Sequence, residues 1–305
     1  MASVPLPASS SAAGIGWALA AFGGFSTVDA IVKLTSETVP VMQVAFLMTL
    51  ASFLPVLLVV MIEGGFRKFW PAVPGLVLLR ALLASVTVLQ AFQAFSRLPL
   101  ADAYALIFTT PMWVALLSVP LLGEKVGWRR GVAVAGGFVG VLIMIRPGEA
   151  EALRLGHLFA AGCAFTAALA FLTTRRIGGR ARGGVQLLTV SVCVVLVTAP
   201  SYLARPATLD LPLAFLLGFA GIVQGAAQFC IWRALRSSEA SVVVPFQYSQ
   251  LLWATLYGVL IFDAWPEPST LLGAGVVIAS GLYIMRRERR LAVQARGWGG
   301  PAKRR

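Results

Sequence analysis

Charged residues are scarce in this sequence. They make up 12% of its 305 residues, and hydrophobic residues make up 58%, whereas a soluble domain carries about 25% charged residues. Apolar runs long enough to cross a bilayer recur from one end of the chain to the other, since about 20 apolar residues span the hydrocarbon core. The composition therefore excludes a soluble globular protein and predicts an integral membrane protein with hardly any chain left for a soluble domain.

Histidine and cysteine are also rare. The chain has one histidine, His157, and three cysteines, Cys163, Cys193 and Cys230, which all lie inside apolar runs. No CxxC spacing occurs, and a single histidine cannot complete a metal site with these thiols. We therefore expect buried reduced thiols, no metal and no cofactor. The first residues lack the basic region of a cleaved signal peptide, so the first apolar run is predicted to be a retained helix.

Ten apolar segments are predicted to be membrane-spanning helices. Their runs are continuous, whereas the strands of a membrane barrel would be short segments of alternating apolar and polar residues. The segments are 14–34, 40–62, 73–95, 100–122, 128–146, 154–174, 185–204, 211–233, 239–262 and 268–286. The predicted fold class is therefore an all-α integral membrane protein with ten transmembrane helices.

The few charges are unevenly placed, and they give a formal net charge of +13. Lysine and arginine gather in alternate short connections and in the C-terminal tail, which is the positive-inside pattern of membrane proteins. This placement predicts both termini on the cytoplasmic side of the cell inner membrane and argues against nucleic acid as a partner. We expect an N-terminal cytoplasmic segment over 1–13 and a basic cytoplasmic tail over 287–305 that lies on the anionic inner leaflet.

Two halves of the chain share one layout. Asp102 leads into a span that holds Pro111, and Glu239 leads into a later span that holds Pro245. These matches define a first repeat over 14–148 and a second over 154–286, each with five spans. An odd number of spans forces the two repeats into opposite orientations, which is the inverted-repeat plan of secondary transporters, with the substrate site near the membrane midplane between the halves.

Several motifs make the chain resemble a known family. They are the RLPLADA segment that starts at Arg97, the LGEK segment that starts at Leu122, the RPG turn that starts at Arg146, and the SEASVVVPFQYSQLLWA segment that starts at Ser238. With these motifs the sequence resembles the drug/metabolite transporter superfamily, specifically its tandem EamA carriers. The pattern departs from the family at Asp263, where a glutamate is usual, so no role is carried over to that residue.

The resemblance implies a carrier that moves a small organic metabolite by alternating access. The last of these segments is similar to the subgroup of bacterial riboflavin and S-adenosylmethionine uptake carriers. Riboflavin uptake is the first expectation, followed by S-adenosylmethionine uptake and then by export of amino-acid-like metabolites or drugs. The expected partners are the small-molecule substrate and the lipid bilayer, with the choice between monomer and homodimer open.

Two functions other than transport by a carrier are alternatives to the one that the resemblance implies. A membrane-embedded lipid-modifying enzyme would need clustered acidic ligands or a nucleophile beside its base, and the acidic residues here are scattered. A structural or channel subunit is the second alternative, and saturable transport of a substrate would argue against it.

Polar and aromatic residues within the spans are the candidate substrate-binding residues. Amides at helical spacing can bind a polar ligand or bond across helices, and a pocket of aromatic rings with a few polar groups suits a flat heterocycle. The alternative for the aromatic residues is packing or contact with lipid. The candidates are Asp29, Gln90, Gln93, Tyr104, Phe108, Trp113, Gln224, Gln228, Gln247, Tyr248 and Trp253.

Asp29 carries the strongest signal, because ionisable residues inside membrane spans are costly and are usually functional. Its alternative is local pairing with Lys33, four residues later on the same helix. Asp102 and Glu239 join Asp29 as candidates for coupling to an ion, although each also stands where a carboxylate would cap a helix.

An arginine and two prolines inside the spans can each be interpreted in more than one way. Arg80 could hold an anionic group, pair with Asp29 or Asp102, or extend to the inner face of the membrane. Pro111 and Pro245 fall inside corresponding spans and are predicted to kink them, which a moving gate could use.

Overall fold

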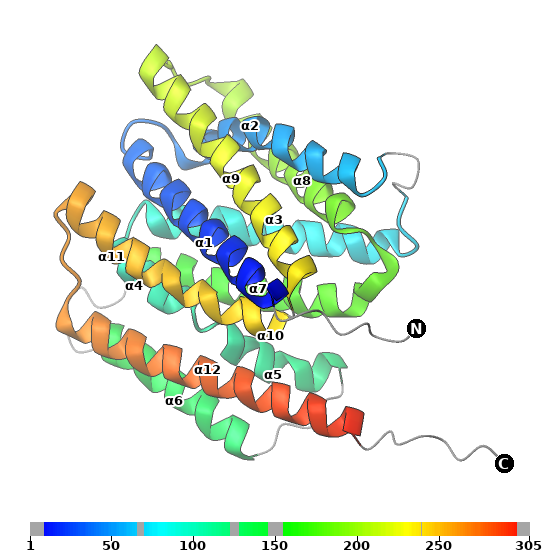
Figure 1. Cartoon of the computed structure of the whole chain (residues 1–305). Coiled ribbons are helices and arrows are strands. Elements are labelled where there is room, and N and C mark those ends of the chain that lie inside the picture. Colours follow the sequence, from blue (N-terminus) through cyan, green and yellow to red (C-terminus); the bar gives the residue numbers. More distant parts are fainter. Residues whose placement is uncertain (1–8, 66–69, 123–127, 146–154, 239, 298–305) are drawn as a thin grey trace.

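The computed structural model describes residues 9–65, 70–122, 128–145, 155–238 and 240–297. Every regular element in these ranges is a helix (Figure 1). Eight helical segments are long and apolar enough to cross a membrane, so the protein is an all-helical, multi-pass membrane protein. They belong to α1 (Ser9–Thr35), α2 (Val41–Ile62), α3 (Pro74–Phe95), α4 (Leu100–Ile107) with α5 (Thr110–Leu122), α7 (Leu155–Ile177), α8 (Gly183–Ala204), α9 (Leu211–Ser237) and α12 (Pro268–Gly297).

Two more predicted spans contain shorter helices. The apolar part of α6 (Trp128–Ile145) is Gly131–Ile145, because the helix opens with two arginines after its tryptophan. The segment before α12 is divided into α10 (Ala240–Val243), the 3₁₀ helix η3 (Val244–Tyr248) and α11 (Ser249–Phe262). A further short 3₁₀ turn, η2 (Gly178–Arg180), follows α7.

The span predicted over 100–122 is present as two helices, because α4 ends at Ile107 and α5 begins at Thr110. The interruption lies beside Pro111, where the sequence predicts a kink. Pro111 has no N–H to donate to the carbonyl of Ile107, and a proline ring clashes with the carbonyl four residues before it. The Thr110 hydroxyl donates to the Ile107 carbonyl instead, at 2.6 Å. Pro245 lies in η3, so a proline accompanies the interruption in the later segment as well.

The C-terminal helix is longer than the predicted span. The sequence pattern places the end of the last span at residue 286, whereas α12 continues to Gly297. The basic segment predicted over 287–305 therefore begins within a helix, and residues 298–305 lie outside the described ranges.

Four pairs of packed helices each join a helix of the first half of the chain to one of the second half. Two of these pairs are antiparallel and two are parallel. Helices α1 and α9 pack antiparallel, with Gly14 against Ala234 and Gly24 against Ala227. Helices α3 and α7 also pack antiparallel, because hydrogen bonds join Arg80 to Thr174 and Thr87 to Thr166. These bonds measure 3.1 and 2.9 Å.

The parallel pairs are α2 with α9 and α3 with α8. On α2, Met48 lies against Gly221 and Ser52 lies against Gly225. On α3, a nitrogen of Arg80 donates to the Gln186 carbonyl at 3.2 Å, and the Ser85 hydroxyl donates to the Val190 carbonyl at 3.4 Å. In both pairs the residue numbers rise together, so the helices run in the same direction.

Helices α2 and α8 pack antiparallel and are tied at both ends. At one end the Glu63 carboxylate accepts a hydrogen bond from the Gly184 backbone at 2.6 Å, and at the other the Gln43 amide oxygen accepts one from the Ala207 backbone at 2.9 Å. Helices α6 and α12 also cross antiparallel and lie side by side (Figure 1), with the backbones of Gly140 and Gly273 in close contact.

Helix α4 lies at the centre of the main hydrophobic core. Six of its eight residues are buried, and it contacts α3, α6, α7, α11 and α12. A short, buried helix bounded by a break is a rigid platform for any side chain it carries. The side chain that matters most for the site is Tyr104.

Candidate substrate site

Asp29 is buried on α1, about two turns before the end of that helix. Its carboxyl group accepts a hydrogen bond from the Tyr104 hydroxyl on α4. The alternative of local pairing with Lys33 is wrong, because the Lys33 amine donates to the Leu98 carbonyl at 2.8 Å and lies over the ring of Phe262. The intramembrane carboxyl group is therefore held by a tyrosine from another helix.

Tyr104 joins three helices through its hydroxyl group. Besides Asp29, the hydroxyl lies 3.4 Å from the Ser26 hydroxyl of α1 and accepts a hydrogen bond from the Gln250 amide of α11 at 3.1 Å. We call these four residues the Asp29–Tyr104 junction. Sequence reasoning missed Ser26 and Gln250, although each stands three residues before a predicted site residue, Asp29 and Trp253 respectively, and so shares a helix face with it.

Aromatic rings continue from this junction to both helix interruptions. The ring of Tyr104 lies 5.2 Å from that of Phe95 and 5.7 Å from that of Phe108, the residue that directly follows α4. Phe108 meets Tyr248 edge to face at 5.0 Å. Since Tyr248 is the last residue of η3, the interrupted helices of the two halves touch through these two rings.

Trp253 and Tyr257 form the α11 side of the same region. Their rings stack at 6.3 Å, the Trp253 ring packs on Gly23, and the hydroxyl groups of Tyr257 and Thr27 are hydrogen-bonded at 2.8 Å. A carboxylate beside aromatic faces is a combination that can bind a cationic group on a flat heterocycle, since aromatic faces attract cations.

Other predicted residues lie away from the junction. The Gln90 amide accepts a hydrogen bond from Thr166 of α7 at 2.9 Å, and Gln93 bonds to Arg97, one turn later. Trp113 packs edge to face on Phe138 and Phe165, at 5.4 and 5.2 Å. For Gln90 the structure places the amide in a bond across helices, which was the alternative to a cavity role.

The candidates for coupling and gating have separate positions. The Asp102 carboxylate accepts a hydrogen bond from the Thr270 hydroxyl at 2.7 Å, which ties the start of α4 to α12. Glu239 lies outside the described residues. Pro111 follows the break after α4, and Pro245 and Gln247 lie in η3.

Gln224 and Gln228 line a cavity of about 120 Å³ between α2, α3, α8 and α9, together with Arg80. The predicted pairing of Arg80 with Asp29 or Asp102 is wrong, because its guanidinium group donates to the Thr174 hydroxyl at 3.1 Å and to the Gln186 carbonyl at 3.2 Å. The glutamines and Arg80 thus form a second polar region.

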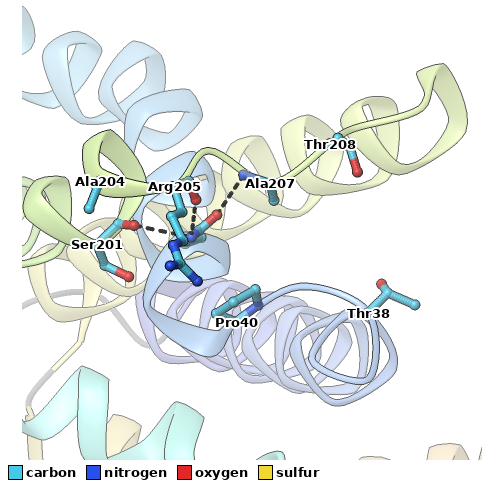
Figure 2. Close-up of a pocket in the computed structure, with 8 residues that line it drawn as sticks. Thr38, Pro40, Ser201, Ala204, Arg205, Ala207 and Thr208 are labelled. Carbon is cyan, nitrogen blue, oxygen red and sulfur yellow. Dashed lines mark hydrogen bonds between the residues drawn. The ribbon is translucent and has the colours of Figure 1, made fainter.

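A larger hollow, of about 530 Å³, lies where α2 begins and α8 ends. Figure 2 shows that hydrogen bonds run across its floor. The Gln43 amide donates to the carbonyls of Ser201 and Arg205, at 3.1 and 2.8 Å, and accepts from Ala207 at 2.9 Å. The Gln43 amide makes three hydrogen bonds within the protein and thereby joins the start of α2 to the end of α8.

No cluster of His, Cys, Asp and Glu that could hold a metal ion occurs within the part of the chain that the structure describes. The polar groups of both regions are instead amides, hydroxyls, one carboxyl group and one guanidinium. Such groups bind and orient a ligand through hydrogen bonds and charge.

Comparison with known proteins gives a family. The EamA-like transporter family matches residues 12–146 and again residues 154–286. An S-adenosylmethionine uptake transporter of Rickettsia bellii is 26% identical over 280 residues, covering 91% of this chain and 94% of that protein. A riboflavin transporter of Rhizobium johnstonii is 30% identical over 216 residues, 70% of each chain.

A protein of known crystal structure has the same fold. It is 20% identical with a TM-score of 0.59, and the match covers 89% of this chain and 98% of that one. With two matches to one family model, the chain belongs to the EamA-like transporter family of the drug/metabolite transporter superfamily and carries two tandem copies of its domain.

Proposed function

We propose that the protein is a ten-span secondary carrier made of two inverted five-helix repeats. In this scheme α1, α2, α3, α4–α5 and α6 correspond to α7, α8, α9, α10–α11 and α12. A two-fold axis in the membrane plane turns every helix over, so corresponding helices must run antiparallel. The antiparallel pairs α2–α8 and α6–α12 agree with this requirement.

The remaining helix pairs support the same symmetry. Exchanging the repeats converts the pair α1–α9 into α7–α3, and both pairs are antiparallel. The same exchange converts α2–α9 into α8–α3, and both pairs are parallel. Contacts between α1 and α11 likewise have their counterpart between α7 and α5.

The observation that carries the proposal is the contact between the interrupted helices. Transporters of this plan place the substrate at the interface of the repeats, where broken helices meet. Here Phe108 from the first break touches Tyr248 from the second, and Phe108 packs on Tyr104, which holds Asp29. Movement of one half against the other would open and close this region, which is alternating access, and Asp29 is the first candidate for coupling.

We place both termini on the cytoplasmic side of the inner membrane. Arginines follow the end of α7, precede α8 and close α9, which are neighbouring ends in the bundle. On that side the Glu63 carboxylate accepts a hydrogen bond from the Trp232 indole at 2.7 Å. The positive-inside rule assigns this end to the cytoplasm.

We propose S-adenosylmethionine as the first cargo, from the charge and rings around Asp29, and uptake as the direction, from the names of similar transporters. This metabolite joins a flat heterocycle to a sulfonium cation and an ammonium group, which suit the Asp29 carboxyl group and the neighbouring aromatic rings. Riboflavin, the first expectation from the sequence, offers the heterocycle without a cation. It remains the second candidate because aromatic faces line the Asp29–Tyr104 junction.

Labelled uptake in a bacterial host without its own importers tests the proposal. Cells that make the wild-type protein should accumulate labelled S-adenosylmethionine in a saturable manner, and a riboflavin auxotroph that expresses the protein should be assayed for growth at low riboflavin. Saturable uptake of riboflavin alone would reverse the order of the two cargoes. Uptake of neither, with the protein shown to be in the membrane, would overturn both assignments.

A further inference from the structure

The cavity between α2, α3, α8 and α9 lies at the centre of the proposed two-fold arrangement. It is walled by two helices from each half, and Ser52, Ala84, Val194 and Gln224 stand on its wall close to the midpoints of their helices. Its polar side chains are Thr49, Ser52, Arg80, Ser191, Gln224 and Gln228. A polar cavity at mid-length of a membrane bundle is a position where a substrate group would be bound.

Arg80 brings an unneutralised cation to this cavity. A guanidinium group has five N–H donors, and here two hydrogen bonds reach neutral acceptors, the Thr174 hydroxyl and the Gln186 carbonyl. No carboxylate forms an ion pair with it among the residues that the structure describes. Charged side chains within membranes normally pair, so the remaining donors are available to an anion.

The two glutamines also have unused hydrogen-bonding capacity. Gln224 and Gln228 stand one turn apart on one face of α9 and line the same cavity. The Gln224 amide oxygen is buried without a hydrogen-bond partner within the described ranges. Buried polar groups are nearly always hydrogen-bonded in folded proteins, so this amide oxygen has a hydrogen-bonding capacity that a bound ligand can use.

We infer that the cavity is a binding site for the carboxylate of an amino-acid-type ligand, held by Arg80 and flanked by Gln224 and Gln228. Its volume of about 120 Å³ corresponds to roughly four water molecules. A volume of this size suits a compact polar group such as a carboxylate. One guanidinium cation matches the single charge of a carboxylate, and an amide nearby can accept a hydrogen bond from the ligand's ammonium group.

This inference rests on the proposed function and narrows it to substrates with a carboxylate. S-adenosylmethionine has such a group and riboflavin does not.

A matched pair of ligands tests the inference on the purified full-length protein. S-adenosylmethionine and its decarboxylated analogue differ only in the carboxylate, and binding of each is measured from the ligand dependence of the thermal unfolding midpoint. The wild-type protein should bind the carboxylated ligand about 10- to 100-fold more tightly, as expected for hydrogen bonds to a charged group. L-methionine and its decarboxylated amine form a second pair for the case of a different cargo.

Substitutions on α3 and just after it provide the controls. Arg80→Gln should abolish the preference for the carboxylate and leave binding of the decarboxylated analogues unchanged, whereas Arg80→Lys should retain part of the preference. Arg97→Gln removes an exposed cation two residues after the end of α3 and should leave the preference intact. If Arg80→Gln does not fold, Gln228→Leu and Arg80→Lys carry the test, and each should reduce the preference.

Several results would overturn the site. The first is equal binding of the two members of each ligand pair by the wild-type protein. The second is the absence of saturable stabilisation by any carboxylate-bearing ligand. The third is a preference for the carboxylated ligand that persists in both Arg80 variants and in Gln228→Leu. The uptake assay separates this failure from failure of the carrier. If the protein takes up either cargo but shows no preference for the carboxylate, the carboxylate site is wrong and the carrier function stands. If the preference is present but neither cargo is taken up, the proposed transport is wrong and the carboxylate site stands.

Discussion

Asp29 and Arg80 are both ionisable side chains inside membrane helices, yet the protein surrounds them in different ways. Asp29 receives a hydrogen bond from Tyr104, which is itself bonded to Gln250. Arg80 borders a cavity in which Gln224 and Gln228 make no hydrogen bond with the described residues. The Asp29 carboxyl group thus has a hydrogen-bond donor within the protein, whereas the Gln224 amide oxygen at the Arg80 cavity has no partner among the described residues.

The two regions also differ in depth and in partners. The Asp29–Tyr104 junction joins α1, α4 and α11 close to one end of α1 and connects through Phe108 to both helix interruptions. The Arg80 cavity stands at mid-length between α2 and α8, which are tied at both ends. We therefore expect substitutions at the junction to alter transport and stability together, and substitutions in the cavity to separate them.

The largest effect is expected from Asp29→Asn, because it removes the charge while keeping the size of the side chain. Labelled uptake should fall by about 10- to 100-fold, the loss expected for a hydrogen bond to a charged group. Asp210→Asn is the matched control, since Asp210 is exposed and caps α9 by accepting from the Leu213 backbone at 3.0 Å. Asparagine caps equally well, so that variant should transport normally. Wild-type uptake by Asp29→Asn at normal expression would contradict the role of the junction.

Tyr104→Phe tests whether the junction also holds the fold together. Without the hydroxyl, the Asp29 carboxyl group stays buried and loses its donor, which should lower the free energy of unfolding by about 1–3 kcal/mol. Tyr257→Phe is the control, because it loses one bond between neutral hydroxyl groups, to Thr27, and should cost about 1 kcal/mol or less. Denaturant unfolding in detergent compares the two; an equal cost for both would show that Asp29 does not depend on Tyr104.

Gln224→Leu should stabilise the protein, whereas Tyr104→Phe should destabilise it. It replaces a buried amide that lacks a partner by an apolar group of similar size, so the free energy of unfolding should rise by about 1 kcal/mol, while transport of a carboxylate-bearing substrate should fall. Gln90→Leu breaks the bond to Thr166 and should destabilise the protein instead. A destabilised Gln224→Leu would mean that the amide has a partner within the protein.

The smallest effect is expected from Gln93→Ala. Gln93 was a predicted cavity residue, but it bonds to Arg97 in an exposed pair. Substitutions at such positions usually change stability by less than about 0.5 kcal/mol, and uptake should stay within about twofold of wild type by the same measure. A strong loss of uptake would mean that Gln93 contacts the substrate, so that substrate contacts would not be confined to the Asp29–Tyr104 junction and the Arg80 cavity.

The positions of the helices could largely be predicted from the sequence, because apolar length alone identifies a membrane helix. Kinks at Pro111 and Pro245 were also predicted, but the lengths of the interruptions could not be. Pro55 and Pro200 lie inside uninterrupted helices, whereas Pro111 follows a break and Pro245 lies in a 3₁₀ turn. A proline permits an interruption, and neighbouring side chains such as that of Thr110 decide whether the freed carbonyl is satisfied.

Site residues were harder to predict because sequence spacing shows which residues share a face but not which way that face points. Gln224 and Gln228 share a cavity as their spacing indicated, while Gln90 turns to α7. Asp29 was identified from the cost of burying its charge. Its partner Tyr104 came from a segment 75 residues away, and only packing could show that contact.

Counterflow in proteoliposomes tests the central claim most directly, because it requires one site that faces each side in turn. Vesicles loaded with unlabelled S-adenosylmethionine, or in parallel with riboflavin, are diluted into the labelled compound. We expect a transient accumulation of label above equilibrium for S-adenosylmethionine, which Asp29→Asn should lose and Asp210→Asn should keep. Label that only approaches equilibrium with both compounds, or an overshoot that Asp29→Asn leaves unchanged, would contradict it.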